Sequence, residues 1–326
     1  MTFRLTKEAG LEYNLLSSGI CAPMTRVIIG VALGVIPEVL IDGVVTHHEI
    51  TPSSEPGQST LTITGRDVTA TMDLEERDDA FPNQPDSVIV ARLLLGYARY
   101  GILPDVIPTA CIRLEVNEIA RQAGTDLDAI KRMAKANGYV FYVEPVTFGV
   151  NRAYFGPEVR VGMPLSALSV NLGDATNVKS LNFTMDALAP VGTKGTFIDP
   201  LLGLTLPIPE LPSLKVPPLS LKPASPLRTV RLRDTANQLP TDAALSALAR
   251  TMNAPDAVKG TGTLDALRYG SVLRARRIVG VRGAGASYNG FYLVKRVTHS
   301  ISRGKYAQSF DLSREGTLTT TPMVSP

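Results

Sequence analysis

The sequence predicts a mainly β protein that carries an α+β insertion. Residues 268–316 contain three stretches with the alternation of a half-buried strand, separated by glycine-containing turns. Residues 1–73 show the same alternation in shorter stretches, whereas residues 74–160 hold two helical patterns. With 326 residues, 44% hydrophobic and 19% charged, the chain is long enough for two or three globular domains.

The first 73 residues predict several short antiparallel strands of a small barrel or sandwich. The run from Val27 to Val35 is strongly apolar, Val39 to Ile50 alternates, and Ser59 to Thr64 alternates again. A turn cluster, Thr51 to Gly57, separates the last two. The side chains expected on one face of the middle strand are Val44, Thr46, His48 and Ile50, and those expected to point inward from the last are Leu61 and Ile63.

Two helices are predicted between residues 74 and 160. The first opens at Pro85-Asp86-Ser87 and stops near Gly101, and the second follows the N-cap Thr125 and ends at Asn137-Gly138. A hairpin of Tyr139 to Glu144 and Ala153 to Phe155 comes next. The expected buried stripes are Val88, Ala91, Leu94 and Leu95 in the first helix and Leu127, Ile130, Met133 and Ala134 in the second.

The last long stretch predicts three consecutive strands. They are Ser271 to Val281, Phe291 to Ile301 and Tyr306 to Ser313, joined by turns at Asn289-Gly290 and Arg303-Gly304. Residues 161–196 return to β patterning, and the residues after Gly316 lack any pattern. The strand residues expected on one face of the third strand are Tyr306, Phe310 and Leu312, and a helix over 241–252 is expected to bury Leu245, Leu248, Ala249 and Met252.

Residues 197–226 form a proline-rich segment that also contains many large apolar residues. Its proline density excludes a helix or a central strand. We interpret it as an extended arm that lays apolar side chains on another surface, and the alternative is a disordered tether. The side chains predicted to dock are Leu201, Leu204, Leu206, Ile208, Leu211, Leu214, Val216 and Leu219.

Composition excludes several functional classes. A net charge of +3, from 33 basic and 30 acidic residues, does not favour direct nucleic-acid recognition. The longest apolar run, Val27 to Ile36, is well short of the ~20 residues that span a bilayer, so no membrane insertion is expected. Cys21 and Cys111 make no disulfide framework, and the N-terminus does not resemble a signal peptide. These features predict folding in the reducing cytoplasm.

The residues suggest no catalytic, cofactor or metal site. Side chains of the adjacent His47 and His48 point to opposite faces of a strand, and His299 lies between Thr298 and Ser300 in another. The glycines from Gly280 to Gly285 lead into a strand, so no helix N-terminus faces a phosphate there. No nucleophile with a paired base is visible, and no cofactor is expected.

Three stretches nevertheless resemble one family. The closing strands carry Tyr292-x-Val294-x-x-Val297-x-His299, then Gly304-x-Tyr306, Phe310 and Ser313-Arg314-Glu315-Gly316. This order resembles the phage late-control gene D proteins, the baseplate hub proteins of contractile tails, which are related to the hub half of VgrG and of extracellular contractile injection system spikes. Residues 43–77 and the stretch TDLDAIKRMAKANGYVFYVEP followed by AYFGP resemble the same family, and the matches cover most of 40–160 and 265–316.

The resemblance implies a domain order of two tube-like antiparallel β-barrel domains plus a helix–hairpin α+β domain. Hub proteins usually have one or two further strands before the point where this chain begins, so closure of the first barrel stays open. The expected divisions are the first barrel over 1–73, the α+β domain over 74–160, the second barrel over 161–196 and 260–316, the proline-rich arm and a short helix over 197–259, and a flexible tail over 317–326.

The resemblance also implies a structural function. A homotrimer would adapt the trimeric spike to the hexameric inner tube of a phage tail or injection system, in the baseplate of a particle assembled in the cytoplasm. The implied partners are a spike protein, an inner tube or tube-initiator protein, and baseplate wedge or LysM-type adaptor proteins. A basic set in the second barrel is interpreted either as a solvated sheet face or as a tube wall or subunit interface: Arg274 and Arg276 on one face, Arg277 on the other, and Lys295 and Arg296.

Two other functional classes compete with this interpretation. A tail-associated peptidoglycan hydrolase is the alternative, because baseplate hubs sometimes carry lytic domains, but no acid/base pair is visible for it. A carbohydrate-binding receptor module is disfavoured because aromatic residues make up only 6% of the chain and Trp is absent.

Overall fold

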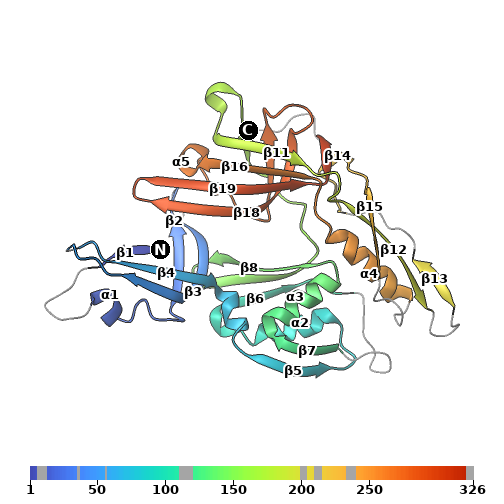
Figure 1. Cartoon of the computed structure of the whole chain (residues 1–326), viewed down its shortest axis with the longest axis horizontal. Coiled ribbons are helices and arrows are strands. Elements are labelled where there is room, and N and C mark those ends of the chain that lie inside the picture. Colours follow the sequence, from blue (N-terminus) through green and yellow to red (C-terminus); the bar gives the residue numbers. More distant parts are fainter. Residues whose placement is uncertain are drawn as a thin grey trace. The chain divides into compact units, whose positions relative to one another are not determined.

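The computed structural model describes most of the chain. It is mainly β, as the sequence predicts, and it divides into two compact units, which Figure 1 shows in the colours of the sequence. The first unit comprises Met1–Ala32, Pro37–Ala134 and Val140–Gly156, and the second comprises Leu33–Ile36, Lys135–Tyr139 and Pro157–Pro326. The described residues are 1–5, 13–34, 37–55, 57–109, 120–198, 204–208, 215–232 and 240–320.

A four-stranded antiparallel sheet opens the first unit. Its strands are β1 (Thr2–Arg4), β2 (Arg26–Val31), β3 (Glu38–Thr51) and β4 (Thr60–Asp67), in the order β1-β4-β3-β2. A short helix, α1 (Asn14–Ser17), and a 3-10 turn, η1 (Val68–Met72), flank these strands. The buried side chains that share one cluster are Leu5, Cys21, Val45, Leu61 and Ile63.

This sheet confirms one predicted face and corrects another. Leu61 and Ile63 are buried, as predicted. The single face expected from Val44 to Ile50 is wrong, because a bulge between Val45 and His47 interrupts the alternation of β3. Val44 and Val45 are both buried as a result, whereas Ile50 is exposed. The predicted strand Val27 to Val35 ends at Val31.

The rest of the first unit combines two helices with short strands. The helices are α2 (Asp86–Leu95) and α3 (Asp126–Ala136), with a 3-10 turn, η2 (Ala98–Tyr100), after α2. The strands β5 (Glu76–Phe81) and β7 (Ala120–Thr125) pair antiparallel. In a three-stranded sheet, β9 (Val150–Gly156) lies between β6 (Ile102–Val106), to which it is parallel, and β8 (Val140–Thr147).

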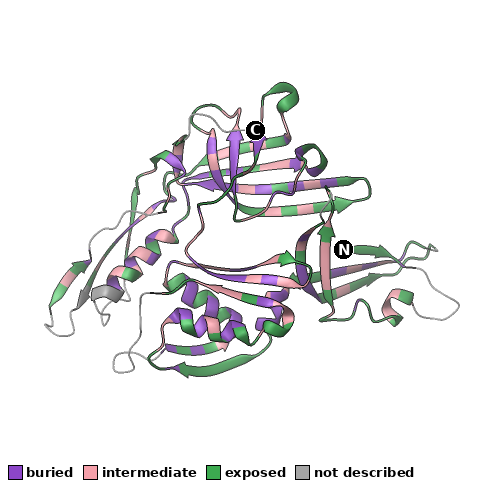
Figure 2. Ribbon diagram, turned by 180° about the vertical axis from the view of Figure 1, so that it is seen from behind, coloured by how far each residue is buried: buried purple, intermediate pink, exposed green. Residues whose placement is uncertain are grey.

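The buried stripes predicted for the two helices are confirmed in α3 but only partly in α2. In α3 the four predicted side chains are buried, and the backbone N–H of Asp128 donates to the Thr125 hydroxyl (3.3 Å) in the predicted cap. In α2 the predicted stripe is partly wrong, since Leu94 is buried but Val88 and Leu95 are exposed. This helix packs on β6 and β9, and its buried positions, mapped in Figure 2, include Ile89, Val90, Leu93 and Leu94.

A curled six-stranded sheet forms the centre of the second unit (Figure 1). Every neighbouring pair is antiparallel except β10 and β17, which are parallel. A core cluster that includes Leu168, Tyr292 and Phe310 packs on this sheet. The strands in spatial order are β10 (Leu165–Ser169), β17 (Ile278–Arg282), β18 (Gly290–Ser302), β19 (Lys305–Arg314), β16 (Val258–Asp265) and β11 (Val178–Met185).

The predicted closing strands are confirmed for β18 and β19, with a turn at Arg303-Gly304. Tyr306, Phe310 and Leu312 are buried on one face of β19, as the period of two requires. The strand predicted from Ser271 to Val281 is shorter, because β17 begins at Ile278 and the preceding residues form an irregular loop. The strand β16 lies outside the predicted strands.

The proline-rich segment contributes short strands to the second unit. In a three-stranded sheet, β12 (Val191–Ile198) lies between the antiparallel β13 (Thr205–Ile208) and the parallel β15 (Arg228–Arg231). The strand β14 (Ser220–Pro223) pairs with β20 (Gly316–Thr319), which includes residues 317–319 of the expected flexible tail. Prolines lie in β13 and β14, both of them edge strands, where a missing N–H is tolerated.

Two helices and a 3-10 turn complete the second unit: α4 (Pro240–Met252), α5 (Ala266–Tyr269) and η3 (Gly173–Ala175). The existence of α4 is as predicted, and it packs on β12 and β13. Its predicted stripe is partly wrong: Ala249 is buried as predicted, but Leu245 is exposed and two alanines outside the stripe, Ala243 and Ala247, are buried. Small side chains allow this close helix–sheet contact. Among the described residues, no helix is long and apolar enough to cross a membrane.

Candidate functional site

The motif Ser313-Arg314-Glu315-Gly316 follows directly from the buried strand β19. Each of its four residues makes a contact outside its own strand. The Ser313 hydroxyl donates to Asp256 Oδ2 (2.7 Å). The Arg314 guanidinium, which is fully buried, donates to the carbonyl oxygens of Gly316, Asn289 and Ser287, each at 2.8 Å. The motif therefore joins the end of the sheet to the loop between β17 and β18.

Arg314 is held as a buried cation without a direct carboxylate partner among the described residues. Burial lowers its pKa, and the neighbouring Tyr292 and Glu315 oppose that effect. Its guanidinium carbon lies 4.3 Å from the centre of the Tyr292 ring, a cation–π contact, and burial raises the pKa of the Tyr292 hydroxyl well above its ordinary value. Three carbonyl oxygens and the ring face replace water around the charge.

Glu315 and Gly316 attach the proline-rich segment to this point. Oε1 of Glu315 accepts hydrogen bonds from the backbone N–H and the hydroxyl of Ser220, at 2.6 and 3.1 Å, and from the N–H of Leu219. A Cβ at Gly316 would lie 2.0 Å from the carbonyl oxygen of Lys222. Only glycine lets β14 pass this close to β20, which explains the residue type at the end of the motif.

Glu315 also belongs to a set of charged side chains with a buried centre and the exposed Lys295 at its edge, here called the charge cluster. Arg160 is at its centre, with its side chain 1% exposed. Its guanidinium donates to Asp256 (3.0 Å), Glu158 (2.9 Å) and Glu315 (2.8 Å). Lys215 donates to Asp256 (2.8 Å), and Lys295 pairs with Glu158. The members are Glu158, Arg160, Lys215, Asp256, Lys295 and Glu315, so three formal positive charges meet three negative ones.

The electrostatics of the charge cluster favour full ionisation. Burial alone would raise the pKa of Asp256, but the charges of Lys215 and Arg160 and hydrogen bonds from Lys215 and Ser313 lower it to about 2. For Glu158 burial also acts upward, yet Lys295 and Arg160 bring the pKa below its ordinary value. Burial lowers the pKa of Lys215, opposed by Asp256. A carboxylate with so low a pKa is a poor proton acceptor near neutral pH. The arrangement therefore suits holding chain segments together better than acid–base catalysis.

The charge cluster connects distant segments of the second unit. Its members come from residues 158–160, from the proline-rich segment at 215, from the loop after α4 at 256, from the middle of β18 at 295 and from the residue after β19 at 315. Sequence reasoning missed this set, since its members are spread over more than 150 residues. One signal was available: two charged residues, Arg314 and Glu315, stand next to each other where the alternating strand β19 ends.

The five basic residues predicted to form a tube wall or subunit interface do not share one surface in the structure. Arg274, Arg276 and Arg277 precede β17 and do not lie on a strand, so their predicted division between two sheet faces is wrong. Arg276 has a φ of 62°, which a regular strand would not allow. Its N–H donates to the carbonyl of Val294 (2.6 Å). Lys295 joins the charge cluster, and Arg296 pairs with Asp311 (3.1 Å) across β18 and β19 at the surface.

The predicted docking side chains fall into three groups. Leu201, Leu211 and Leu214 lie outside the described residues. Ile208 is buried with Ala243 and Ala247 of α4, and Leu219 is buried against Ile278 and Leu293 of the sheet. Leu206 is half-buried, whereas Leu204 and Val216 are exposed. The two buried members therefore cover the second unit of their own chain.

Histidines and metal-ligating groups form no site in the described part of the chain. No group of three His, Cys, Asp or Glu side chains there could hold a metal ion. Nδ1 of His299 lies 2.8 Å from the Tyr306 hydroxyl, which in turn accepts from Gln308 (3.0 Å). Burial and the charge of Arg274 lower the pKa of His299. This residue belongs to a buried hydrogen-bond chain.

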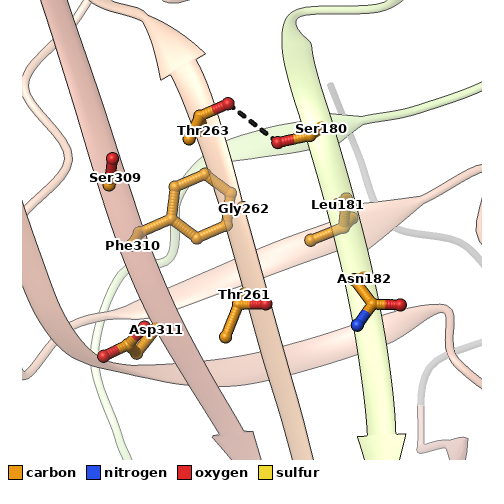
Figure 3. A pocket seen from close by; sticks show the side chains of 9 residues that line it. All are labelled: Ser180, Leu181, Asn182, Thr261, Gly262, Thr263, Ser309, Phe310 and Asp311. Carbon is orange, nitrogen blue, oxygen red and sulfur yellow. Dashed lines mark hydrogen bonds between the residues drawn. The ribbon is translucent and has the colours of Figure 1, made fainter.

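A shallow hollow of ≈ 310 Å³ crosses β11, β16 and β19 (Figure 3). Gly262 makes room for the Phe310 ring, since a Cβ at this position would lie 2.6 Å from that ring. The Ser180 and Thr263 hydroxyls are hydrogen-bonded to each other at 2.8 Å, as drawn in Figure 3. Hydroxyls, an amide and one carboxylate line the hollow without a general base beside a nucleophile, so its chemistry is that of a polar sheet surface.

Comparison with known proteins identifies the fold. A family model described as the Alg8 N-terminal domain matches residues 8–183, more than half of the 326 residues. No curated protein matches the sequence. Among solved structures, a tail protein from Neisseria meningitidis MC58 is similar with a TM-score of 0.61 and 14% identity, over 87% of this chain and 83% of that chain.

Two further solved structures are similar over most of the chain. The 43 kDa tail protein of prophage MuSo2 from Shewanella oneidensis has a TM-score of 0.60 and 17% identity, over 97% of this chain and 88% of that chain. The E. coli c3393 protein, a component of the type VI secretion system, has a TM-score of 0.57 and 14% identity, over 93% and 68%. At these identities the similarity shows a shared fold: that of tail proteins.

Proposed function

The chain belongs to the family described as the Alg8 N-terminal domain, and from its tail-protein fold we propose that it is a structural baseplate hub protein of a contractile tail. Both phage tails and phage-tail-like injection systems are tails of this kind. The observation that carries the proposal is the similarity to two tail proteins over 87% and 97% of this chain. The ordered run from Tyr292 to Gly316, which resembles the late-control gene D hubs, also supports the proposal.

In this proposal three copies assemble around the tail axis. Each copy contributes two curled sheets, one from each unit, and three copies contribute six. The three copies of the chain match the three-fold symmetry of a trimeric spike, because closed cyclic symmetry repeats each contact. Their six sheets match the six subunits around a hexameric inner tube. The partners would be the spike, the inner tube or tube-initiator protein, and wedge or LysM-type adaptor proteins of the baseplate.

The second unit supports a role that bears load. Its charge cluster and the motif Ser313 to Gly316 tie the proline-rich segment, the loop after α4 and the six-stranded sheet to one another. The third similar structure, c3393, is described as structurally similar to the T4 bacteriophage tail proteins gp27 and gp5. The particle would be assembled in the cytoplasm, with this chain in its baseplate.

Two measurements test the proposal. Light scattering of the purified chain, alone and with its spike, should give the mass of a trimer, or of a trimer bound to the spike. Electron microscopy of particles that carry a tagged copy should place the tag on the tail axis. A stable monomer in the presence of the spike, or a tag away from the axis, would contradict the hub. A zymogram that showed cell-wall clearing by the chain alone would favour the hydrolase instead.

A further inference from the structure

The first unit contains a pocket of ≈ 300 Å³ between β5, α2 and η2, here called the arginine pocket. It is separate from every contact in the second unit described above. Three arginines line it, together with three acidic and three aromatic side chains. The lining residues on which the argument depends are Leu74, Arg77, Asp79, Arg92, Arg99 and Asp126.

One wall of the arginine pocket is a closed network. Arg77 pairs with Glu75 (3.1 Å) and with the buried Asp126 (3.4 Å). Asp126 also accepts hydrogen bonds from the Tyr97 hydroxyl (2.7 Å) and from Gln122 (2.6 Å). Burial, and then the bond to Asp126, raise the pKa of the Tyr97 hydroxyl well above its ordinary value. Both carboxylates hold the Arg77 guanidinium, so Arg77 forms part of the wall.

The other two arginines have no acidic partner among the described residues. The guanidinium carbon of Arg92 lies 5.7 Å from the centre of the Phe81 ring, and that of Arg99 lies 4.8 Å from the centre of the Tyr100 ring. Stacking restrains both side chains while it leaves their N–H groups available in the plane of each guanidinium. The geometry is that of a receptor for carboxylates, which bind such a fork through two parallel hydrogen bonds.

Exposed apolar side chains flank these arginines. Val88 and Leu95, 51% and 63% exposed, share a face of α2 with Arg92 through the i, i+4 and i+7 spacing. Leu74, 64% exposed, lines the pocket itself. The same surface therefore offers apolar contact beside two positive charges, which is the composition of a protein-binding site.

We propose that the arginine pocket and the α2 face of Val88 and Leu95 bind a segment of a partner protein in which an acidic side chain lies next to apolar ones. The carboxylate pairs with Arg92 and Arg99, and the apolar side chains cover Leu74 and Leu95. A continuous polyanion fits poorly, because the carboxylate of Asp79, which has no cationic partner in the described part of the chain, lines the same pocket and would repel successive phosphates. The inference names a surface and a ligand chemistry, so it does not depend on a place at the tail axis.

The test places a photoreactive residue beside the pocket in the full chain, in the cells that naturally make it. Leu95→p-benzoylphenylalanine leaves both arginines intact. The expected product is a covalent adduct with one protein, whose cross-linked peptide carries Asp or Glu within about one helical turn of the attachment point. Added to this background, Arg92→Glu with Arg99→Glu should lower the yield about tenfold, since two ion pairs become repulsive.

Matched controls separate recognition from folding. Arg121→Glu reverses one arginine charge, half of the change in the double variant, at an exposed position of β7 outside the pocket and should leave the yield unchanged. The double variant should unfold at the same temperature as the parent. Equal yields from the double variant and Arg121→Glu, a captured peptide without an acidic residue, an adduct to nucleic acid, or no adduct would each overturn the proposal.

The outcomes also distinguish this proposal from the proposed function. An acidic peptide captured from a protein with no place in a tail would support the arginine pocket and contradict the baseplate hub. A trimer on the tail axis whose Leu95 probe captures nothing would support the hub and overturn the arginine pocket.

Discussion

Arg160 in the second unit is surrounded by three carboxylates and is shielded from water, whereas Arg92 and Arg99 in the first unit have aromatic rings beside them and no carboxylate. The difference lies in what compensates the charge. In the charge cluster the compensation is internal and complete, so it fastens one segment of the chain to another. In the arginine pocket no described carboxylate forms an ion pair with Arg92 or Arg99, so these two charges are available to a partner. The same side chain thus serves cohesion in one unit and recognition in the other.

This comparison makes a strong prediction for Asp256→Ala. The change leaves Arg160 and Lys215 buried with one carboxylate fewer, and breaking a buried pair in this way costs about 3–5 kcal/mol of unfolding free energy. Urea unfolding followed by hydrogen exchange in β19 measures the loss. The matched control is Asp311→Ala, which breaks the exposed pair with Arg296 and should cost less than about 1 kcal/mol. Equal losses would mean that burial does not distinguish the two pairs.

Acid should weaken the charge cluster in a defined window. The pKa of Asp256 is lowered from 3.8 to about 2 in the folded chain. A lowered pKa contributes stability that is present above the unfolded value, about 4, and is lost as the pH falls through about 2; the amount is roughly 2 kcal/mol. The difference in unfolding free energy between wild type and Asp256→Asn, measured from pH 5 downward, should shrink by about this amount. A difference independent of pH would exclude Asp256 as the titrating group.

The contact at Gly316 tests the fastening without changing a charge. In Gly316→Ala the new Cβ would lie 2.0 Å from the Lys222 carbonyl, so β14 must separate from β20, at a cost of about 1–3 kcal/mol. Faster hydrogen exchange and faster proteolysis over 215–223 should report this separation. Gly34→Ala is the control, because a Cβ there meets nothing within 4 Å. Unchanged exchange in β14 would show that Glu315 alone holds this strand.

The closing hairpin and α3 could be predicted from the sequence because their signals are local. The turn Arg303-Gly304 determines the register of β18 and β19, and the alternation then determines which side chains are buried. In α3 the cap at Thr125 and a narrow apolar stripe agree with each other. Neither case requires knowledge of a distant segment.

The features that the sequence did not predict all depend on tertiary contacts. In α2, apolar residues occupy nearly every position from Val88 to Leu95, so only packing on β6 and β9 selects the buried face. The loop around Arg276 alternates like a strand, yet its contacts with Val294 give it a positive φ. The charge cluster joins residues from Glu158 to Glu315, and no spacing in the sequence records that proximity.

The smallest expected effect on stability completes the comparison. Replacing Arg92 and Arg99 together by alanine removes two exposed guanidiniums that have no ion pair to lose among the described residues, so the unfolding free energy should change by no more than about 1 kcal/mol, mainly from the two ring contacts. Urea unfolding followed by hydrogen exchange in α2 measures this change. Arg160→Ala, the corresponding loss of an arginine in the charge cluster, should cost several times more, because it leaves three carboxylates with only the two cations Lys215 and Lys295. A large loss from the alanine pair would mean that Arg92 and Arg99 serve the fold of the first unit, and the distinction between fastening and recognition would then fail.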